Sequence, residues 1–340
     1  MRHLFFITQN YSYSILRPLQ DVIRKRGGEV AWLLAGDELN YDYLQEDETR
    51  LHTVEEAIHY SPDACYAPGD VIPHMIPGIK VNVFHGFNVA GKKNKFKIRG
   101  FFDLYCTQGP DTTQPFQRLS EKHHSFRAIE TGWPKLDPLF TNTTSKLNAK
   151  KPTILYSSTF SDRLSSAPHL LTTIEQLASQ EDWHWLITLH PKMKQDVVAN
   201  YKAIQNEKIT FIESDNLIPI LLQADVMLCD TSSIMYEFLL MKKPVVTFNN
   251  PIKSAYFLNT NNTNEISSLL KYALSKPNSL MQSIDDYTKT IHPSTDGKSS
   301  GRVLDAVEWF MNDGCHGLRK KSLNLLRRYK IREKLGYYKW

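Results

Sequence analysis

Two histidines follow apolar runs of strand length, one in each half of the chain. His85 comes after Val81–Phe84 and is followed by a glycine, and His190 comes after Trp185–Leu189 and is followed by a proline. An imidazole titrates near neutral pH, so it can act as a general base or donate a hydrogen bond to a phosphate. A single histidine at a strand end is more often structural, but one in each half favours a catalytic role for both.

A polar run in the second half is typical of a phosphate site. The apolar run Val226–Cys229 leads into four small polar residues, Asp230, Thr231, Ser232 and Ser233, and a helical pattern follows. Free N–H groups and partial positive charge at a helix start suit a phosphate or diphosphate. Glu237, one turn further on, is placed to hold a ribose hydroxyl, and Thr159 is a further donor-binding candidate in another strand-end loop. The alternative is that Asp230 and Thr231 only cap the helix.

Two cations are further candidates for phosphate binding. Lys92 follows His85 closely in a glycine-containing loop, and Arg302 opens the helical segment Val303–Met311. A guanidinium or an ammonium near a strand end or helix start can pair with a phosphate. The alternatives are a solvated loop for Lys92 and an exposed side chain for Arg302.

The remaining histidines and the cysteines do not suggest a metal centre. His123, His124 and His292 have no partners at metal-ligand spacing, and we interpret them as surface residues. The four cysteines are far apart: Cys65, Cys106, Cys229 and Cys315. No C-x-x-C pair occurs, and three of the cysteines lie in apolar runs, which indicates buried thiols in a reducing compartment. We therefore expect no metal and no cofactor besides the donor substrate itself.

Short apolar runs alternate with longer amphipathic segments along the whole chain. The expected strands are Leu4–Thr8, Val30–Ala35, Val81–Phe84, Leu104–Thr107, Ala128–Thr131, Thr153–Ser158, Trp185–Leu189, Ile209–Ile212, Val226–Cys229 and Val245–Phe248. The expected helices include Ile15–Arg26, Leu170–Gln180, Ile218–Ala224 and Ile234–Met241. This alternation predicts an α/β protein with two doubly wound, Rossmann-like domains, whose ligands bind at the carboxyl ends of the strands.

The series of strands restarts after a polar stretch, which predicts the domain boundaries. Residues 141–152 read as a linker between an N-terminal domain, 1–140, and a donor-binding domain, 153–314. Residues 315–340 then form a basic, amphipathic tail. In this arrangement the ligand cleft would lie between the two domains.

The net charge of +5 is concentrated in that tail. Residues 317–340 hold nine Lys or Arg and one Glu, which leaves residues 1–316 with 32 basic and 35 acidic side chains. A slightly acidic body argues against a nucleic-acid-binding protein. The first apolar run is too short for a signal peptide, and no run is long enough to span a bilayer. We expect a cytoplasmic protein with at most peripheral membrane contact.

The tail has a partly amphipathic pattern. Leu318, Leu325, Leu326 and Tyr329 share one helical sector, and basic residues lie largely opposite them. Such a segment fits the anionic inner face of the cell membrane. The alternatives are a solvated, disordered end or a helix that packs back on the body.

Taken together, these residues resemble the CDP-glycerol glycerophosphotransferase family, which includes wall-teichoic-acid primases and polymerases and their capsule relatives. The matching segments, in order, are His85-Gly86, Gly132 to Asp137, Ile154 to Phe160, Leu189-His190-Pro191, Ala224 to Phe238, Lys243-Pro244 and Asp296 to Arg302. The resemblance implies a two-domain glycosyltransferase-B (GT-B) architecture and a CDP-linked alcohol as donor. The family's usual threonine and proline after the first histidine motif are replaced by Phe87 and Asn88, and its tyrosine after the aspartate is Thr231.

The resemblance implies transfer of a polyol phosphate, most simply glycerol phosphate, to a hydroxyl of a lipid-linked or polymeric acceptor, with release of CMP. His85 would be the base, and His190 would stabilise the leaving CMP. Three alternatives remain open. The chain could be a glycosyltransferase of the same fold, a nucleotide-sugar 2-epimerase, or a membrane-associated scaffold without activity.

Overall fold

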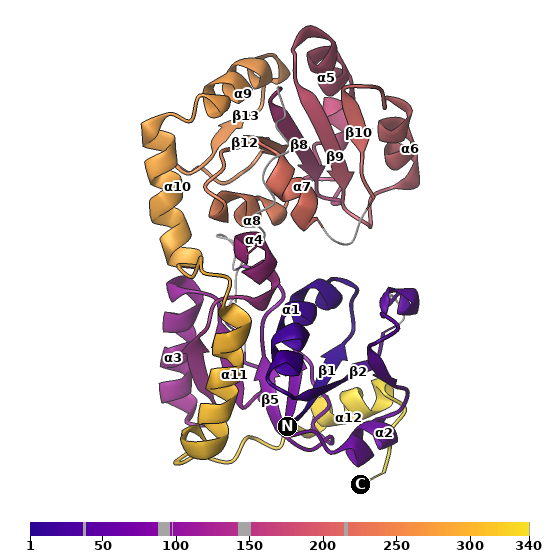
Figure 1. The fold of residues 1–340 in the computed structure, drawn as a ribbon, viewed down its shortest axis with the longest axis vertical. Coiled ribbons are helices and arrows are strands. Elements are labelled where there is room, and N and C mark those ends of the chain that lie inside the picture. Colours follow the sequence, from indigo (N-terminus) through magenta and orange to yellow (C-terminus); the bar gives the residue numbers. More distant parts are fainter. Residues whose placement is uncertain (37–38, 88–95, 97, 142–150, 214–216, 340) are drawn as a thin grey trace. The chain divides into compact units, whose positions relative to one another are not determined.

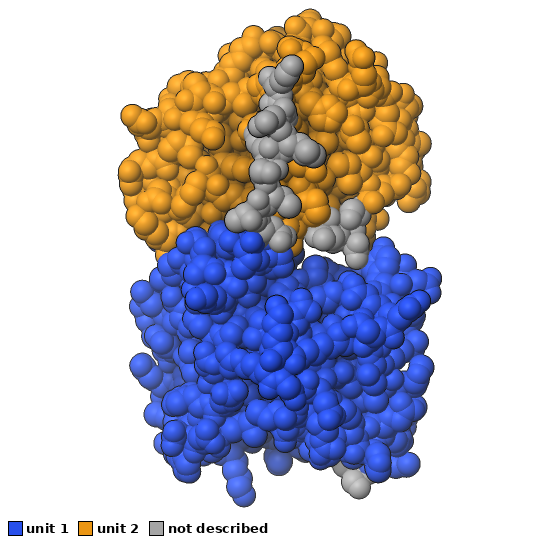
Figure 2. All heavy atoms as spheres, viewed as in Figure 1, with its two compact units in different colours: residues 1–88, 92–141, 290–340 blue, residues 89–91, 142–289 orange. Residues whose placement is uncertain are grey.

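The computed structural model describes residues 1–36, 39–87, 96, 98–141, 151–213 and 217–339. The chain forms two compact units, coloured separately in Figure 2. Unit 1 comprises residues 1–88, 92–141 and 290–340, and unit 2 comprises residues 89–91 and 142–289. Each unit has its own parallel sheet and its own hydrophobic core.

Within the described residues, unit 1 is built on a seven-stranded sheet of order β3-β2-β1-β4-β5-β6-β7. Its strands are β1 (Arg2–Ile7), β2 (Glu29–Leu34), β3 (Thr49–Leu51), β4 (Ala64–Ala67), β5 (Ile79–Asn82), β6 (Leu104–Thr107) and β7 (Arg127–Glu130). All pairings are parallel. The strand order reverses between β1 and β4, as in doubly wound folds, which carry helices on both faces of the sheet.

The helices of unit 1 come from both ends of the chain (Figure 1). They are α1 (Tyr11–Lys25), α2 (Val54–Tyr60), α3 (Pro110–His123), α4 (Asp137–Thr141), α11 (Ser299–Trp309) and α12 (Leu325–Lys334). Leu4, Phe5 and Phe6 of β1 are all buried. A continuous apolar run of this kind is expected for a parallel strand that is covered on both faces.

Unit 2 repeats this architecture with a six-stranded parallel sheet of order β10-β9-β8-β11-β12-β13 among the described residues. Its strands are β8 (Thr153–Ser158), β9 (His184–Leu189), β10 (Ile209–Phe211), β11 (Val226–Cys229), β12 (Val245–Phe248) and β13 (Leu258–Thr260). Its helices are α5 (Ala167–Gln180), α6 (Gln195–Ala203), α7 (Ile218–Gln223), α8 (Ile234–Leu240), α9 (Ile266–Leu274) and α10 (Asn278–Ile291), the last of which ends where unit 1 resumes. The strand order reverses between β8 and β11, so unit 2 also has a switch point.

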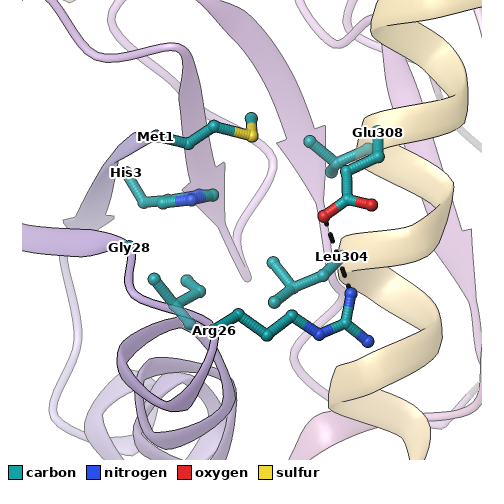
Figure 3. A pocket seen from close by; sticks show the side chains of 8 residues that line it. Met1, His3, Arg26, Gly28, Leu304 and Glu308 are labelled. Carbon is teal, nitrogen blue, oxygen red and sulfur yellow. Dashed lines mark ion pairs between the residues drawn. The ribbon is translucent and has the colours of Figure 1, made fainter.

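The C-terminal part of the chain returns to unit 1, which differs from the sequence-based boundary at residue 314. From Thr290 onward the residues belong to unit 1. Helix α11 buries Val303 and Val307 there, and Arg26 at the end of α1 pairs with Asp305 at 2.7 Å and with Glu308 at 3.6 Å. Figure 3 shows the second pair beside a pocket of about 170 Å³ at the amino ends of β1 and β2. These contacts place α11 in the first domain.

The basic tail also packs on unit 1, as one of the alternatives foresaw. Helix α12 buries Ile331 in the core of that unit, with Leu335 and Tyr337 packed against it. Leu325, Leu326 and Tyr329 on the same helix remain exposed. None of the described helices has the length and apolar character required to cross a membrane. Of the four cysteines, three are buried and Cys315 is exposed.

Candidate functional site

His85 is held at the carboxyl edge of the first sheet by a short turn after β5. The Phe84 N–H donates to Asn82 Oδ1 at 3.0 Å, and Phe84 adopts a positive φ of 59°. Asn82 Nδ2 donates to the Gly69 carbonyl at 2.9 Å, which ties this turn to the loop after β4. His85 Nδ1 lies 3.3 Å from the Pro68 carbonyl oxygen. A carbonyl can only accept, so Nδ1 carries a proton, and in the neutral ring Nε2 offers a lone pair.

Tyr11 is a neighbour of His85 that the sequence did not single out. Its ring lies 5.8 Å from the imidazole, centroid to centroid. Tyr11 opens α1 directly after β1, and burial, with a smaller effect of Asp70, raises the pKa of its hydroxyl. Strands β1, β4 and β5 are neighbours in the sheet, so the residues after them meet at the switch point. The placement of Tyr11 after the first strand is the signal that could have found it.

Asp230 organises the carboxyl edge of the second sheet. It follows β11, and none of it is exposed. Its carboxylate accepts hydrogen bonds from Ser158 Oγ at 2.6 Å, from the Thr159 N–H at 3.0 Å and from the Ser166 N–H at 2.9 Å. A buried carboxylate repels phosphate, so Asp230 positions the loop after β8. Direct contact of Asp230 with the donor stays a prediction.

The residues after Asp230 are more open. Thr231 and Ser232 are partly exposed and Ser233 is exposed, and their hydroxyls form no hydrogen bond to the described part of the chain. Ser233 stands at the start of α8 without a side-chain cap bond, so the run does not serve simply as a helix cap. Glu237 lies in the first turn of α8 and is buried. Its contact with a ribose stays a prediction.

His190 lies on the loop after β9, which is separated from β11 by β8 in the same sheet. Its Nδ1 accepts a hydrogen bond from the Lys192 N–H at 3.0 Å, which leaves the proton on Nε2 of the neutral ring. Burial lowers the pKa of His190, with a further effect of Lys192, so the neutral form prevails at pH 7. The exposed Phe160 ring lies 4.4 Å from the imidazole, centroid to centroid. His190 is therefore set as a hydrogen-bond donor, whereas His85 is set as an acceptor.

The second sheet thus gathers several candidates at one edge. Strands β9, β8 and β11 are adjacent, and they are followed by His190, by the partly exposed Thr159 and by Ser232. Loops at the carboxyl ends of neighbouring parallel strands are where α/β folds bind ligands. The hydroxyls and the Nε2–H at this edge are all neutral donors.

Arg302 lies elsewhere, which corrects its assignment to the donor-binding domain. It belongs to unit 1, where its guanidinium pairs with Asp296 at 2.8 Å and its Nε donates to the Thr131 carbonyl at 2.7 Å. These bonds hold α11 against the loop after β7. Lys92, the other cationic candidate, lies outside the described residues.

The segments around residues 132–137 and 292–302 form one structural joint in unit 1. Asp137 accepts the N–H groups of Ser299 and Ser300 at 2.8 and 2.7 Å, which satisfies the start of α11. The Trp133 N–H donates to His292 Nε2 at 2.9 Å. His292 is only 1% exposed, so its interpretation as a surface residue was wrong, and burial lowers its pKa to about 4.

In the described parts of the chain, no three His, Cys, Asp or Glu side chains cluster as metal ligands would. The expectation that the protein uses no metal stays a prediction.

Three relatives are informative. A curated teichoic acid glycerol-phosphate primase from Bacillus subtilis (strain 168) is 26% identical over 164 residues, which is 46% of this chain and 42% of the primase. The chain therefore spans less than half the length of that relative. A variant of the wall teichoic acid polymerase TagF matches 93% of this chain and 90% of its own, with 13% identity and a TM-score of 0.67. A UDP-N-acetylglucosamine 2-epimerase structure from Listeria monocytogenes matches 92% and 97%, with 13% identity and a TM-score of 0.66.

The two structures share the fold, which confirms the expected GT-B type architecture. At such low identity they do not distinguish transferase from epimerase. The family described as CDP-Glycerol:Poly(glycerophosphate) glycerophosphotransferase matches residues 87–309, most of the chain. This range includes His190, the Asp230–Ser233 run and the joint around Asp137. The chain therefore belongs to the CDP-glycerol:poly(glycerophosphate) glycerophosphotransferase family.

Proposed function

We propose that this protein transfers glycerol phosphate from CDP-glycerol to a hydroxyl of a lipid-linked or polymeric acceptor, in the synthesis of a teichoic-acid-like cell-surface polymer. The observation that carries the proposal is that two strand-end histidines differ in which ring nitrogen carries the proton. In the neutral rings, the contact of Nδ1 leaves a lone pair on Nε2 of His85 and the proton on Nε2 of His190. Membership of the family supports CDP-glycerol as the donor.

In the proposed reaction, a hydroxyl oxygen of the acceptor attacks the phosphorus farther from cytidine. A bond forms between this oxygen and the phosphorus, and the bond from that phosphorus to the bridging oxygen breaks, so CMP leaves with the bridging oxygen. The hydroxyl proton passes to His85 Nε2 and from there to water. The turn built on Asn82 and the Pro68 carbonyl orients the ring and fixes the Nδ1–H tautomer of the neutral imidazole, in which Nε2 can accept a proton.

His190 and the hydroxyl run after β11 suit the donor's diphosphate. The neutral His190 ring donates through Nε2, and Ser232 and Ser233 donate through hydroxyls that no described group occupies. Preorganised donors of this kind stabilise the charge that grows on the bridging oxygen as it leaves. Thr159 is held beside them by the bond from its N–H to Asp230.

We further propose that the protein works at the inner face of the cytoplasmic membrane. A lipid-linked acceptor would be located there, and the basic residues 317–340 match its anionic surface.

The test is a donor screen with single-site variants. CDP-glycerol and CDP-ribitol are compared with common sugar nucleotides, and the release of CMP, CDP, UMP and UDP is measured. His85→Ala should lower turnover by about 10²- to 10⁴-fold and leave CDP affinity nearly unchanged. The exposed His124 of the same unit provides a control, since His124→Ala should leave both unchanged.

Ser232→Ala combined with Ser233→Ala should instead weaken CDP binding in calorimetry. Transfer of a bare sugar with release of a nucleoside diphosphate would replace the proposal with the glycosyltransferase alternative. Near wild-type turnover in His85→Ala would remove the assigned base.

A further inference from the structure

A basic pocket lies at the opposite edge of the first sheet from His85. The segment between α11 and α12 crosses the loops that precede β6 and β7 and borders an open pocket of about 270 Å³. Its charged lining comprises Arg99, His123, Arg319, Lys320, Lys321 and Arg327, with no Asp or Glu among the lining residues. The pocket thus lies at the amino ends of the strands, whereas His85 follows the carboxyl end of β5.

Only part of this positive charge is neutralised. Arg99 pairs with Asp70 at 3.2 Å, and Lys321 pairs with Asp103. Arg319, Lys320 and Arg327 are exposed, and none of them pairs with a carboxylate in the described parts of the chain. Three cations around one pocket therefore remain available to an external anion.

The pocket is held in shape by bonds to the body of unit 1. The Arg319 N–H donates to the His124 carbonyl at 2.6 Å, and Asn324 Nδ2 donates to the Arg99 carbonyl at 3.0 Å. Gly100 has a φ of +79°, and a Cβ at that position would meet Asn324 Nδ2 at 2.4 Å. The segment that carries the cations therefore has a defined path, in contrast to a solvated basic end.

Apolar side chains alternate with these cations along the same segment. Leu323 is 66% exposed and Leu326 is 73% exposed, and Leu325 and Tyr329 are also exposed. Residues 315–324 and α12 lie along the edge of unit 1 that is lowest in Figure 1. Exposed leucines next to uncompensated cations match a lipid surface, where acyl chains lie directly below anionic head groups.

We propose that this pocket and its leucines form the site that docks the protein on an anionic phospholipid bilayer, with a lipid phosphate in the pocket. The inference deepens the proposed function and rests on it only for the membrane location. A nucleic acid or a free polyphosphate would use the cations but not the leucines. Docking through the amino ends of the strands leaves the His85 edge uncovered for the acceptor.

The test measures partition of the full chain onto vesicles by sedimentation. Phosphatidylcholine vesicles are compared with vesicles that also contain about 30% phosphatidylglycerol, because the attraction requires anionic lipid. Each Lys or Arg near such a surface contributes about fivefold in partition, so Arg319→Gln, Lys320→Gln and Arg327→Gln together should weaken binding roughly 100-fold. The same number of charges removed from exposed sites of unit 2, by Arg163→Gln, Lys253→Gln and Lys276→Gln, should change it by less than about threefold.

A second variant tests the contribution of the exposed leucines to vesicle binding. Leu323→Ser, Leu325→Ser and Leu326→Ser should weaken partition by about 100-fold or more, because three exposed leucines can no longer be buried in lipid. Equal binding of wild type and the cation variant to anionic vesicles would overturn the proposal. The proposal would also be overturned if the wild-type protein did not bind the vesicles while inorganic phosphate bound at these three cations. Vesicle binding needs no turnover, so its failure is distinguishable from failure to release CMP from CDP-glycerol.

Discussion

Asp230→Asn tests how the candidate donor edge is built. In the structure, Asp230 Oδ2 accepts from Ser158 Oγ, from the Ser166 N–H and from Ser166 Oγ, and Oδ1 accepts from the Thr159 N–H. An asparagine has nearly the same shape but replaces one oxygen with an NH₂ group, which cannot accept. The favoured amide orientation keeps the oxygen at the Oδ2 position, so the NH₂ group then faces the Thr159 N–H.

The expected loss of stability follows from these bonds. The 3.0 Å bond from the Thr159 N–H to Oδ1 is lost, and only its longer contact of 3.2 Å with the Oδ2 position remains, at a cost of about 1 kcal/mol. The three remaining bonds change from charged to neutral acceptors, and each then loses about 0.5–1 kcal/mol. Partial relaxation of the loop offsets some of this sum, so we expect unit 2 to lose about 3 kcal/mol of its free energy of unfolding.

The assay is urea unfolding followed by tryptophan fluorescence, to which Trp183 and Trp185 of unit 2 contribute. Two units can unfold separately, so the transition of unit 2 is fitted on its own. CDP affinity provides a second readout. Displacement of Thr159 should weaken CDP binding, whereas a carboxylate in contact with phosphate would repel it, and its replacement would strengthen binding. A loss below about 1 kcal/mol, or tighter CDP binding, would refute the positioning role of Asp230.

Two further predictions concern the joint in unit 1. The pKa of His292 is about 4 in the folded chain and 6.5 when unperturbed, so below pH 6.5 the unfolded state gains a proton that the folded state excludes. Its contribution to stability is therefore complete above pH 6.5 and falls by about 2 kcal/mol between pH 7 and pH 4.5. The free energy of unfolding of His292→Gln, measured at both pH values, should lack this part of the pH dependence. A pH dependence equal to that of the wild type would contradict the assignment. Arg302→Met should cost unit 1 about 1–2 kcal/mol, because a half-exposed ion pair and the bond to the Thr131 carbonyl are lost. CDP affinity should stay within about threefold by calorimetry, and a tenfold loss would instead support a role of Arg302 in phosphate binding.

The architecture was predictable because parallel strands bury continuous apolar runs. All ten expected strands are present, with bounds that shift by three residues at most. Three short strands were missed, and β4 (Ala64–Ala67) matters most, because it lies next to β1 at the switch point. It has four residues and is flanked by Pro62 and Pro68, so its local pattern resembles a loop. The Pro68 carbonyl that sets the tautomer of His85 was therefore not foreseeable.

The neighbouring sequence could not predict the roles of Asp230, Arg302 and His292, for a different reason. Each makes its bonds to residues that are far away in the sequence. Asp230 contacts residues 64–72 positions away, Arg302 contacts Thr131, and His292 contacts Trp133. A polar residue next to a strand or helix end looks the same in the sequence whether it faces solvent or supports another loop. For Arg302 and His292, the return of the chain to unit 1 decides which of these two cases applies.

His85 and His190 illustrate this limit at the site itself. Both follow a strand at the carboxyl edge of a parallel sheet, so the sequence assigned them equivalent places. The atom that meets Nδ1 differs: it is a carbonyl oxygen for His85 and an N–H for His190. One ring is thereby fixed as a proton acceptor at Nε2 and the other as a donor. A transfer reaction needs one of each, a base for the attacking hydroxyl and a donor for the leaving phosphate, and backbone contacts supply this difference without any change in residue type.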